Sequence, residues 1–585
     1  MKHVLTFFSL ISFFAFTQEE VLPIYLTEEE KLQLSTYEFS TQETRGITTP
    51  PQGNIRTMAE WEEIEYLLVT WVPNFSRTLT DIVRAAVNEC KVLIITNNPS
   101  SVANTLGNAN VSLSNVEFVE RGYNTIWIRD YAANSVYKDW NDSLILVDWI
   151  YNRPRPLDNS APEAYAEQLG IPLYQMTEAP TDIIGTGGNF MSDGFGTGFA
   201  SMLIMDENGP GNNFSVTPKS EEDVDNIFGD FMGLSRYIKM ENLPYDAIDH
   251  IDMHMKLLDE ETLIVSEYPE GVADGPQIEA NLQYVLSNYN SVYDTPYRVI
   301  RIPAPPSTQG LHPDQNAHYR NYANQVFVNN TVIVPFYREE YDTIARRVLE
   351  NAMPGYNIVG VNVDGQGGET LIAQGGAIHC ITHAVGVQDP MIISHQRLRD
   401  TYETAENYVA SAYLSHRSGI ASATLYYKTD EAEAYESVEM TDVGDENWEA
   451  EIPAQSAGTD IYYYIQASSE DGKTRTRPMP APEGYWKFKV LGEGDLSVTE
   501  ETMDMDPIYP NPASAITAVP FSGYTDEVGT VSLIDAQGRT VQVIHEGDLS
   551  GEQIFFFNAS LFSKGVYHVK TASNRRLYNQ RVVIQ

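Results

Sequence analysis

Short polar segments with a thiol, an imidazole, two carboxylates and an amide interrupt otherwise apolar sequence in this 585-residue chain. The thiol is Cys380, which ends the segment Gly-Gly-Ala-Ile-His-Cys at 375–380. A lone cysteine is usually a small buried hydrophobe, so its chemistry depends on the segments around it. The other segments are Trp127-Ile128-Arg129-Asp130, His250-Ile251-Asp252 and Asn324 within Tyr-Ala-Asn-Gln.

These residue types are the ones needed to hold and attack a guanidinium. Paired carboxylates, here Asp130 and either Asp252 or a neighbour, accept hydrogen bonds from the N–H edges of the cation. A thiolate can attack its central carbon, and His250 can move the proton that ammonia needs to leave. Carboxylates beside a thiol raise its pKa, so we expect Cys380 to remain a thiol until a bound guanidinium favours the thiolate.

Taken in order, the segments resemble the guanidino-group-modifying enzymes, which include arginine deiminases, agmatine deiminases and amidinotransferases. The nearest resemblance is to the Porphyromonas-type peptidylarginine deiminases, and it covers residues 46–398. Each motif is weak alone, whereas the ordered set is specific. The motifs are Trp-Ile-Arg-Asp at 127–130, Thr-Gly-Gly-Asn at 186–189 with Ser-Asp-Gly at 192–194, Ile-Asp-His-Ile-Asp at 248–252, and Gly-Gly at 375–376 with His-Cys at 379–380.

The resemblance implies a fold and a reaction. The fold is a five-bladed α/β propeller with the site at its centre. The reaction converts peptidyl-arginine to citrulline and ammonia through a cysteine thiouronium intermediate, with no cofactor, no metal and no calcium. Site roles are implied as follows: Cys380 is the nucleophile, His250 the general acid/base, Asp130 and Asp252 bind the guanidinium, Asn324 polarises or positions the site, and Trp127 contributes to the substrate pocket.

A further resemblance concerns the segment Tyr-Asn-Arg-Pro-Arg-Pro at 151–156. It is similar to the family segment whose two arginines bind the α-carboxylate of a C-terminal arginine. The rigid guanidinium forks of Arg153 and Arg155 suit a carboxylate, and the prolines stiffen the loop. The alternative is a solvated basic turn.

Other interpretations remain open. His254 completes a His-x-Asp-x-His pattern with His250, and on a strand these side chains share one face, as a metal-dependent amidinohydrolase would need. Ala247 stands where the family often has an aromatic residue, with Tyr245 further back, so aromatic packing on the substrate is in doubt. The remaining rivals are a deiminase of agmatine or free arginine and a non-catalytic surface adhesin.

Charge limits the possible partners. The chain has 37 basic and 81 acidic residues, for a formal net charge of −44. Such a field argues against nucleic acid and anionic membranes, and it attracts cationic ligands such as arginine-containing peptides or proteins. A surface kept acidic for solubility is the alternative explanation.

The first residues are typical of an exported protein. Residues 1–17 have a basic start, an apolar stretch and a small-residue cleavage pattern, which predicts a signal peptide. Residues 18–45 are polar and are expected to be a propeptide or flexible leader. No stretch is long and apolar enough to span a membrane. Only two cysteines occur, and we expect Cys90 and Cys380 to be free thiols.

Changes in the pattern of apolar and polar residues divide the remaining chain into domains. Residues 46–398 alternate strand-like and helix-like patterns, typical of an α/β domain. Expected strands include residues 143–151 and 325–336, and an expected helix covers 224–234. Residues 399–491 carry short strands without helices, which favours an immunoglobulin-like sandwich. Residues 492–506 are an acidic linker.

Residues 507–585 are expected to form a second small β unit. Its ordered motifs resemble the C-terminal sorting domain of the type IX secretion system: Tyr-Pro-Asn-Pro at 509–512, Asp-Ala-Gln-Gly-Arg at 535–539, Gly-Val-Tyr at 565–567 and Arg-Val-Val-Ile at 581–584. The resemblance implies that the secretion machinery is a partner. It also implies export through the periplasm, ending in secretion or attachment to the outer-membrane surface. A generic adhesive β module is the alternative.

Overall fold

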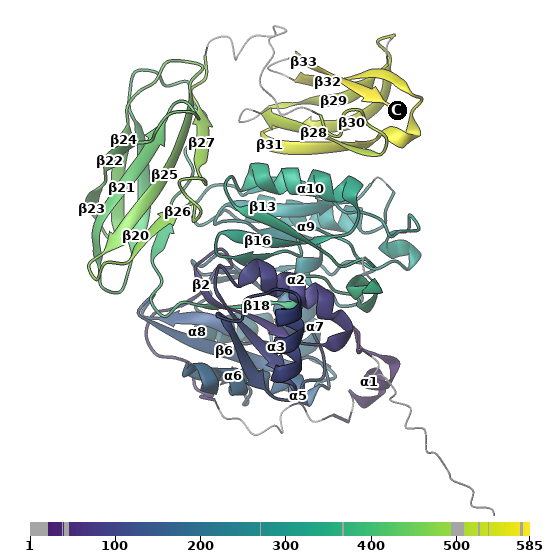
Figure 1. Cartoon of the computed structure of the whole chain (residues 1–585), viewed down its shortest axis with the longest axis vertical. Helices are drawn as coiled ribbons and strands as arrows, with labels where there is room; N and C mark the ends of the chain where they lie inside the picture. Colours follow the sequence, from purple (N-terminus) through teal and green to yellow (C-terminus); the bar gives the residue numbers. More distant parts are fainter. Residues whose placement is uncertain are drawn as a thin grey trace, which may run out of the picture.

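The computed structural model describes residues 21–34, 36–37, 39, 46–269, 271–365, 368–492, 508–523, 527–535, 537–573 and 577–585. The expected signal peptide at 1–17 and nearly all of the expected linker at 492–506 lie outside these residues. The described chain forms a mixed α/β body followed by two β modules (Figure 1). No helix in this part of the chain combines the length and the apolarity needed to cross a membrane.

Within the described residues, the α/β body contains five separate sheets. Each has a middle strand that pairs antiparallel with one neighbour and parallel with the other. The first sheet, in the order β18-β2-β3-β4, is His383–Gly386, Ile64–Thr70, Lys91–Thr96 and Val116–Glu120. The second, β1-β5-β6-β7 with β8 on β6, is Ile55–Thr57, Asn134–Lys138, Ser143–Tyr151, Leu173–Met176 and Ile184–Gly185.

The other three sheets of the body are smaller. The third sheet, β11-β10-β9, is Arg236–Met240, Thr197–Ser201 and Met191–Ser192. The fourth, β12-β13-β14, is Met255–Leu257, Thr262–Glu267 and Arg298–Pro303. The fifth, β15-β16-β17, is Val326–Val328, Thr331–Phe336 and Asn357–Asn362. Because parallel neighbours need a crossover, helices join them. The helices of the body are α2 Ser76–Ala86, α3 Pro99–Asn108, α4 Ile128–Tyr131, α5 Pro156–Asn159, α6 Ala161–Leu169, α7 Leu203–Asn208, α8 Glu221–Met232, α9 Gly275–Asn288 and α10 Glu339–Ala352.

The first sheet joins the two ends of the body. β18 comes from the end of the domain, and it pairs antiparallel with β2 near the beginning, with His383 opposite Leu68. The middle strand β2 is buried along nearly its whole length. The chain segment that carries Cys380 directly precedes β18, so this pairing fixes the thiol relative to the N-terminal part of the body.

Local chemistry accounts for where the elements begin and end. The helix expected at 224–234 is α8, which begins after the capping box of Ser220 and Asp223 and ends at Gly233 in the left-handed conformation. The single strand expected at 325–336 is wrong: β15 and β16 form a hairpin instead. Asn329, with φ of 52°, makes the turn, since asparagine tolerates this region better than β-branched residues do.

The first β module consists of two antiparallel sheets around its own apolar core. One sheet, β19-β20-β24-β23, is Ile392–Ser394, Tyr408–Ser415, Asn447–Ile452 and Thr441–Gly444. The other, β22-β21-β25-β26 with β27 on β25, is Glu436–Glu439, Ile420–Lys428, Asp460–Ser469, Thr474–Arg477 and Trp486–Lys489. Strand β19 precedes the boundary expected at residue 399, yet it pairs with β20 of this module.

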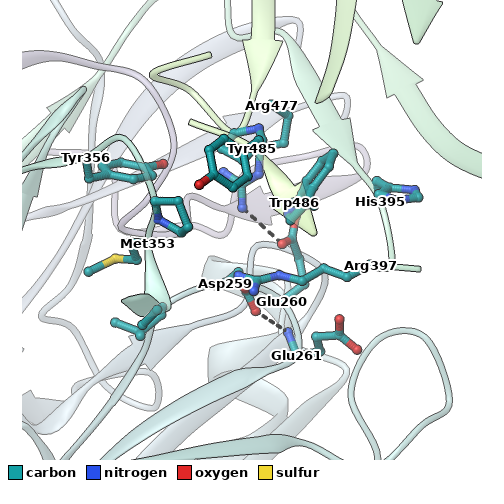
Figure 2. A pocket seen from close by; sticks show the side chains of 14 residues that line it. Asp259, Glu260, Glu261, Met353, Tyr356, His395, Arg397, Arg477, Tyr485 and Trp486 are labelled. Atoms are coloured by element: carbon teal, nitrogen blue, oxygen red, sulfur yellow. Dashed lines mark hydrogen bonds and ion pairs between the residues drawn. The ribbon is translucent and has the colours of Figure 1, made fainter. Parts of the chain in front are cut away.

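Partly buried ion pairs join this module to the α/β body. Figure 2 shows a pocket at the junction, in which Arg477 faces Glu260 at 3.1 Å and Arg397 faces Asp259 at 2.6 Å. None of the candidate catalytic residues lines this pocket. Its charged residues therefore belong to the contact between domains.

The C-terminal β module lies against α10 of the body (Figure 1). Its sheets are β28-β31, Ile516–Gly523 and Gly551–Asn558, and β30-β29-β32-β33, Thr540–Asp548, Val528–Ile534, Gly565–Ser573 and Leu577–Ile584. Strand β31 contacts β14, and the Arg347 guanidinium lies 4.7 Å from the centre of the Tyr509 ring. The β unit expected from residue 507 is thus a β module with its own core.

Candidate active site

The candidate active site is assembled from four short elements that connect the sheets. They are α4, the 3-10 turns η2 Gly187–Asn189 and η3 Ile251–Met253, and the turn η7 His379–Ile381. α4 contacts both η7 and η2, and η2 contacts η3. Segments that lie 250 residues apart in sequence therefore meet at one place.

Cys380 lies in η7 and is completely buried. Two glycines allow the preceding segment to approach it. Gly375 has a φ of 93°, which few other residues adopt. At Gly376, a β-carbon would lie 2.6 Å from the Trp127 ring and 3.1 Å from Cys380 Sγ, so only glycine fits between them. The Gly-Gly pair thus places Trp127 beside the thiol.

Asn324 and Asp252 lie beside the thiol. Asn324 Nδ2 is 3.4 Å from Cys380 Sγ, and Asn324 Oδ1 accepts a 3.0 Å hydrogen bond from the His379 backbone N–H. Cys380 Sγ is 3.9 Å from Asp252 Oδ2. Asn324 thus holds both the sulfur and the backbone that carries it.

His250 and Asp130 form a second pair, also completely buried. His250 Nδ1 is 3.7 Å from Asp130 Oδ1, and His250 Nε2 is 3.3 Å from the Thr186 hydroxyl. A β-carbon on Gly188 would lie 2.3 Å from His250 Nδ1. The Thr-Gly-Gly-Asn segment therefore positions the imidazole because Gly188 has no side chain to displace it.

Several polar atoms of this cluster make no hydrogen bond within the described part of the chain. They are Asp130 Oδ1, Asp252 Oδ1 and His250 Nδ1. Buried polar atoms normally have partners, and exceptions concentrate where a ligand binds. Two carboxylate oxygens without partners, in a cluster that also holds the buried thiol, match the N–H groups of a guanidinium.

Burial and charge shift the pKa values of the cluster in different directions. Burial and the neighbouring Asp252 carboxylate raise the pKa of Asp130 to about 7, and burial lowers the pKa of His250 to about 3. Burial, followed by Asp252 and Asp130, raises the pKa of the Cys380 thiol well above its usual value. At neutral pH the resting site therefore holds a thiol and a neutral His250, as the sequence predicted for the thiol.

A buried charge network behind the site was not predicted from the sequence. The His379 imidazole lies 2.7 Å from Asp252 Oδ2 through Nδ1 and 2.7 Å from Glu60 Oε1 through Nε2. Glu60 also faces Lys256 at 2.5 Å and Arg129 at 3.3 Å. His379 precedes the thiol in the Gly-Gly motif, which is a signal for it, whereas nothing in the sequence distinguishes Glu60 from its neighbours.

This network keeps Asp252 ionised. Burial alone would raise the pKa of Asp252, but the hydrogen bond and the charge of His379 hold it below its usual value. His379, Lys256 and Arg129 likewise outweigh burial at Glu60 and hold its pKa well below the usual value. The His379 contact thus favours the ionised form of Asp252, whereas burial and Asp252 disfavour the ionised form of Asp130.

The chain around His250 is not the strand that the rival metal-site interpretation needs. Residues 251–253 form the 3-10 turn η3, because Asp249 adopts a φ of 57° and the Asp246 carboxylate accepts the His250 backbone N–H. The alternation that would have placed His254 on the same face is therefore absent. Among the described residues, no group of three or more His, Cys, Asp and Glu side chains is arranged to hold a metal ion.

Arg153 and Arg155 are 5% and 1% exposed, so the alternative of a solvated basic turn is wrong. Arg155 donates from Nε to Glu30 Oε1 at 2.7 Å and from Nη2 to Glu30 Oε2 at 3.2 Å. Arg153 Nε donates to the Ile24 carbonyl at 3.2 Å. Both guanidinium groups thus bind the N-terminal segment of the chain.

Cys90 lies apart from the site. It is buried between α2 and β3, and both cysteines of the chain are free. Burial raises the pKa of Cys90 to about 12, as for a thiol in an apolar core. The expectation of two free thiols is confirmed.

The chain is similar to known proteins over the same residues that form the site. The model of the Porphyromonas-type peptidyl-arginine deiminase family matches residues 56–385, and that of the secretion system C-terminal sorting domain matches residues 507–585. An agmatine deiminase of Pseudomonas syringae pv. tomato is 24% identical over 299 residues, which cover 47% of this chain and 78% of the relative.

Solved structures of the same group align with the body. An agmatine deiminase of Enterococcus faecalis aligns with a TM-score of 0.48 and 19% identity, covering 59% of this chain and 99% of that one. The C. jejuni agmatine deiminase aligns with a TM-score of 0.46 and 23% identity, covering 57% and 96%.

The family match covers more than half of the chain, and it includes Asp130, His250, Asp252, Asn324 and Cys380. The resemblance found in the sequence is thereby confirmed for both of its parts. The chain belongs to the Porphyromonas-type peptidyl-arginine deiminase family, whose enzymes hydrolyse a C–N bond of a guanidinium, and it ends in a secretion system C-terminal sorting domain.

Proposed function

We propose that this protein is an exported deiminase that converts peptide arginine, and C-terminal arginine in particular, to citrulline and ammonia. One observation carries the proposal: a buried thiol lies beside an ionised carboxylate, an amide and a neutral imidazole, and two carboxylate oxygens have no partner in the described chain. The family match supports the same reaction.

The arrangement supports a specific order of steps. Asp130 and Asp252 bind the guanidinium through charge-assisted hydrogen bonds, which offset the carboxylates and favour the Cys380 thiolate. Sulfur attacks the central carbon, a C–N bond breaks, and ammonia leaves with a proton that His250 delivers. Water then adds to the S-linked carbon, the C–S bond breaks, and citrulline and the free thiol result.

Each supporting residue has a distinct part in this scheme. His250 is neutral at rest, because its pKa is lowered to about 3, so it can accept the proton that the thiol loses. Asn324 donates its amide N–H toward sulfur and fixes the backbone of η7 through Oδ1. His379 acts through Asp252, since it holds that carboxylate ionised.

Specificity for a C-terminal arginine rests on Arg153 and Arg155. The Arg155 guanidinium already binds a carboxylate, that of Glu30, through the edge formed by Nε and Nη2. This contact supports the proposal that Arg155 binds the α-carboxylate of a substrate. Lysine could not reproduce the planar fork.

Agmatine is the main rival substrate. Similar proteins are named agmatine deiminases, and agmatine has no carboxylate for Arg153 or Arg155 to bind. A preference for agmatine would leave these two arginines with a purely structural role.

The architecture fits export of this reaction. The sorting domain indicates export by the type IX system. We infer that the five sheets of the body are the five blades of a propeller, that the first β module is immunoglobulin-like, and that residues 1–17 are a signal peptide. The protein would then pass through the periplasm to the outer surface.

The experiment that tests the proposal is citrulline release from a substrate panel. The panel contains a peptide ending in free arginine, its C-terminal amide, a peptide with internal arginine, free arginine and agmatine. We expect the free-acid peptide to have the highest kcat/KM and Cys380→Ala to abolish release, with Cys90→Ala as the matched thiol control. Equal citrulline release by Cys380→Ala and the unaltered chain would refute the proposal that Cys380 catalyses the reaction. A higher kcat/KM for agmatine than for the peptides would favour an agmatine deiminase.

A further inference from the structure

The N-terminal residues 21–34, which precede the domain matched by the family, lie across the site. Their helix α1 Glu28–Gln33 begins with a capping box between Thr27 and Glu30. It lies at the edge of the α/β body (Figure 1). We call residues 21–34 the N-terminal segment.

The backbone of this segment binds to the site as a bound peptide does. The Leu22 carbonyl accepts from Trp127 Nε1 at 3.0 Å, and the Ile24 N–H donates to the Gln374 carbonyl at 2.9 Å. The Ile24 carbonyl accepts from Arg153 Nε at 3.2 Å. Trp127 lies beside the thiol, and Gln374 precedes the Gly-Gly turn that leads to it.

The side chains of the segment fill the same region. Ile24 is completely buried, and its Cγ2 would lie 2.8 Å from a β-carbon on Gly375. Nearby in the chain, Phe39 is 3% exposed and packs edge-on against Phe214 at 5.0 Å. The N-terminal part of the chain is therefore attached to the body on both sides of α1.

Glu30 makes the contact that matters most. Its carboxylate binds Arg155 through both oxygens, and the Pro23 carbonyl accepts from Arg155 Nη2 at 2.8 Å. This guanidinium is the one assigned above to a substrate carboxylate. A carboxylate from the chain itself thus binds the guanidinium that is proposed above to bind the substrate's C-terminus.

With the segment in place, the reacting groups are closed off from solvent. Cys380 and Asn324 are completely buried, and His250, Asp252 and Asp130 are each 1% exposed. Glu30 binds Arg155 and the Leu22 carbonyl binds Trp127, so the segment occupies both residues that the proposed function assigns to the substrate.

We propose that the N-terminal segment is autoinhibitory, with Glu30 in place of the C-terminal carboxylate of the substrate. The identity of the excluded substrate rests on the proposed function. The closure of the thiol is independent of that function. The segment must leave the site, by proteolysis or displacement, before substrate binds. The full-length chain is then a latent form of the enzyme.

The first test compares one preparation before and after release of the segment. A protease site is introduced at residues 40–45 of the otherwise intact chain, and the cut protein is separated from the released peptide. We expect kcat/KM for the free-acid peptide to rise at least ~tenfold. The rate of Cys380 alkylation by iodoacetamide, followed by mass spectrometry, should rise by a similar factor while Cys90 stays unchanged.

The second test isolates the carboxylate. Glu30→Gln removes the charge that Arg155 binds, yet glutamine at this position still completes the capping box. We expect the uncut Glu30→Gln chain to show ~tenfold higher kcat/KM and faster Cys380 alkylation, because charge-assisted hydrogen bonds to Arg155 are lost. Glu29→Gln is the matched control, since Glu29 is exposed on the same helix.

The outcomes separate this inference from the proposed function. Faster alkylation of Cys380 after cleavage, without citrulline from any substrate, would support the closure and refute the deiminase. Unchanged alkylation and unchanged kcat/KM after cleavage would overturn autoinhibition. If Glu30→Gln matched Glu29→Gln in both measurements, the role of Glu30 as a carboxylate substitute would be refuted.

Discussion

Two buried clusters of charge in this molecule differ in how completely the protein pairs them. At the junction of the α/β body and the first β module, Asp259 and Glu260 each face an arginine. In the site, Asp130 and Asp252 each keep one oxygen without a hydrogen bond in the described chain. Paired charges hold two domains together, whereas unpaired buried charges destabilise the fold until a partner pairs them.

Within the site itself, the two carboxylates differ in how far they are paired. Asp252 is half paired, since one oxygen binds His379 and the other remains available. The Asp130 ion-pair contact in the described part of the chain is the longer one to His250 Nδ1, at 3.7 Å, and burial and Asp252 raise the pKa of Asp130 to about 7. The difference predicts that the two carboxylates respond differently to pH and to substitution.

The largest effect is expected for Asp252→Asn. It removes the charge that binds the guanidinium and the partner of His379, so kcat/KM should fall ~100-fold, as expected for charge-assisted hydrogen bonds. Asp259→Asn is the matched change at the junction, and it should lower thermal stability while kcat/KM stays within ~threefold. Near-normal kinetics for Asp252→Asn would mean that the site is misassigned.

A somewhat smaller effect is expected for Gly188→Ala. Its β-carbon would lie 2.3 Å from His250 Nδ1, so the imidazole must move. General acid/base catalysis contributes ~10²–10⁴-fold, and misplacing the base should reduce kcat at least ~tenfold. Gly107→Ala is the control, because nothing lies within 4 Å of its β-carbon. Unchanged kcat in Gly188→Ala would show that His250 does not need this position.

The raised pKa of Asp130 predicts how kcat/KM depends on pH. Because its pKa is raised to about 7, kcat/KM should rise with pH through about pH 7 and level off above it. This rise with pH should disappear in Asp130→Asn, whose kcat/KM should be low and independent of pH. If the rise persists in the variant, another titrating group causes it.

The same group links pH to stability with a defined sign. The folded-state pKa of Asp130 lies above its usual value of 3.8, so its contribution to stability is complete below that pH and is lost as pH rises to about 7. Asp130→Asn should therefore raise Tm by a few degrees at pH 8 and by clearly less at ~pH 5. A lower Tm at pH 8 would contradict the assigned shift.

The smallest effect on activity is expected at the junction. Arg477→Ala leaves Glu260 without its cation, which should destabilise the chain by about 3–5 kcal/mol, while kcat/KM of the folded protein stays unchanged. Thermal unfolding and steady-state kinetics on the same samples check both statements. A large loss of kcat/KM would mean that the first β module contributes to catalysis.

The sequence predicted the candidate site residues better than their surroundings. Five of these residues do lie together, and their types and order are what distinguished them in the sequence: Cys380, His250, Asp252, Asp130 and Asn324. The middle strand at 143–151 was also predicted, since a long β-branched and apolar run has few alternatives.

The parts that the sequence did not reveal depend on long-range contacts. Glu60 reaches His379 from 319 residues away, and no local pattern marks it. Glu30 contacts Arg155, which lies 125 residues away in sequence. Neither sequence segment alone predicts this contact between the N-terminal segment and Arg155. The turn at 251–253 depends on the φ of Asp249 and on its capping by Asp246, which overrode the strand-like spacing.

The central claim is that Cys380 attacks the guanidinium, and a covalent adduct tests it most directly. The processed chain, freed of residues up to 45, is mixed with a peptide ending in arginine, quenched in acid within one turnover and digested for mass spectrometry. The account predicts an adduct equal to the substrate minus ammonia on the peptide that contains Cys380, absent in Cys380→Ala. Citrulline formation at the normal rate with no adduct on Cys380, or undiminished in Cys380→Ala, would contradict it.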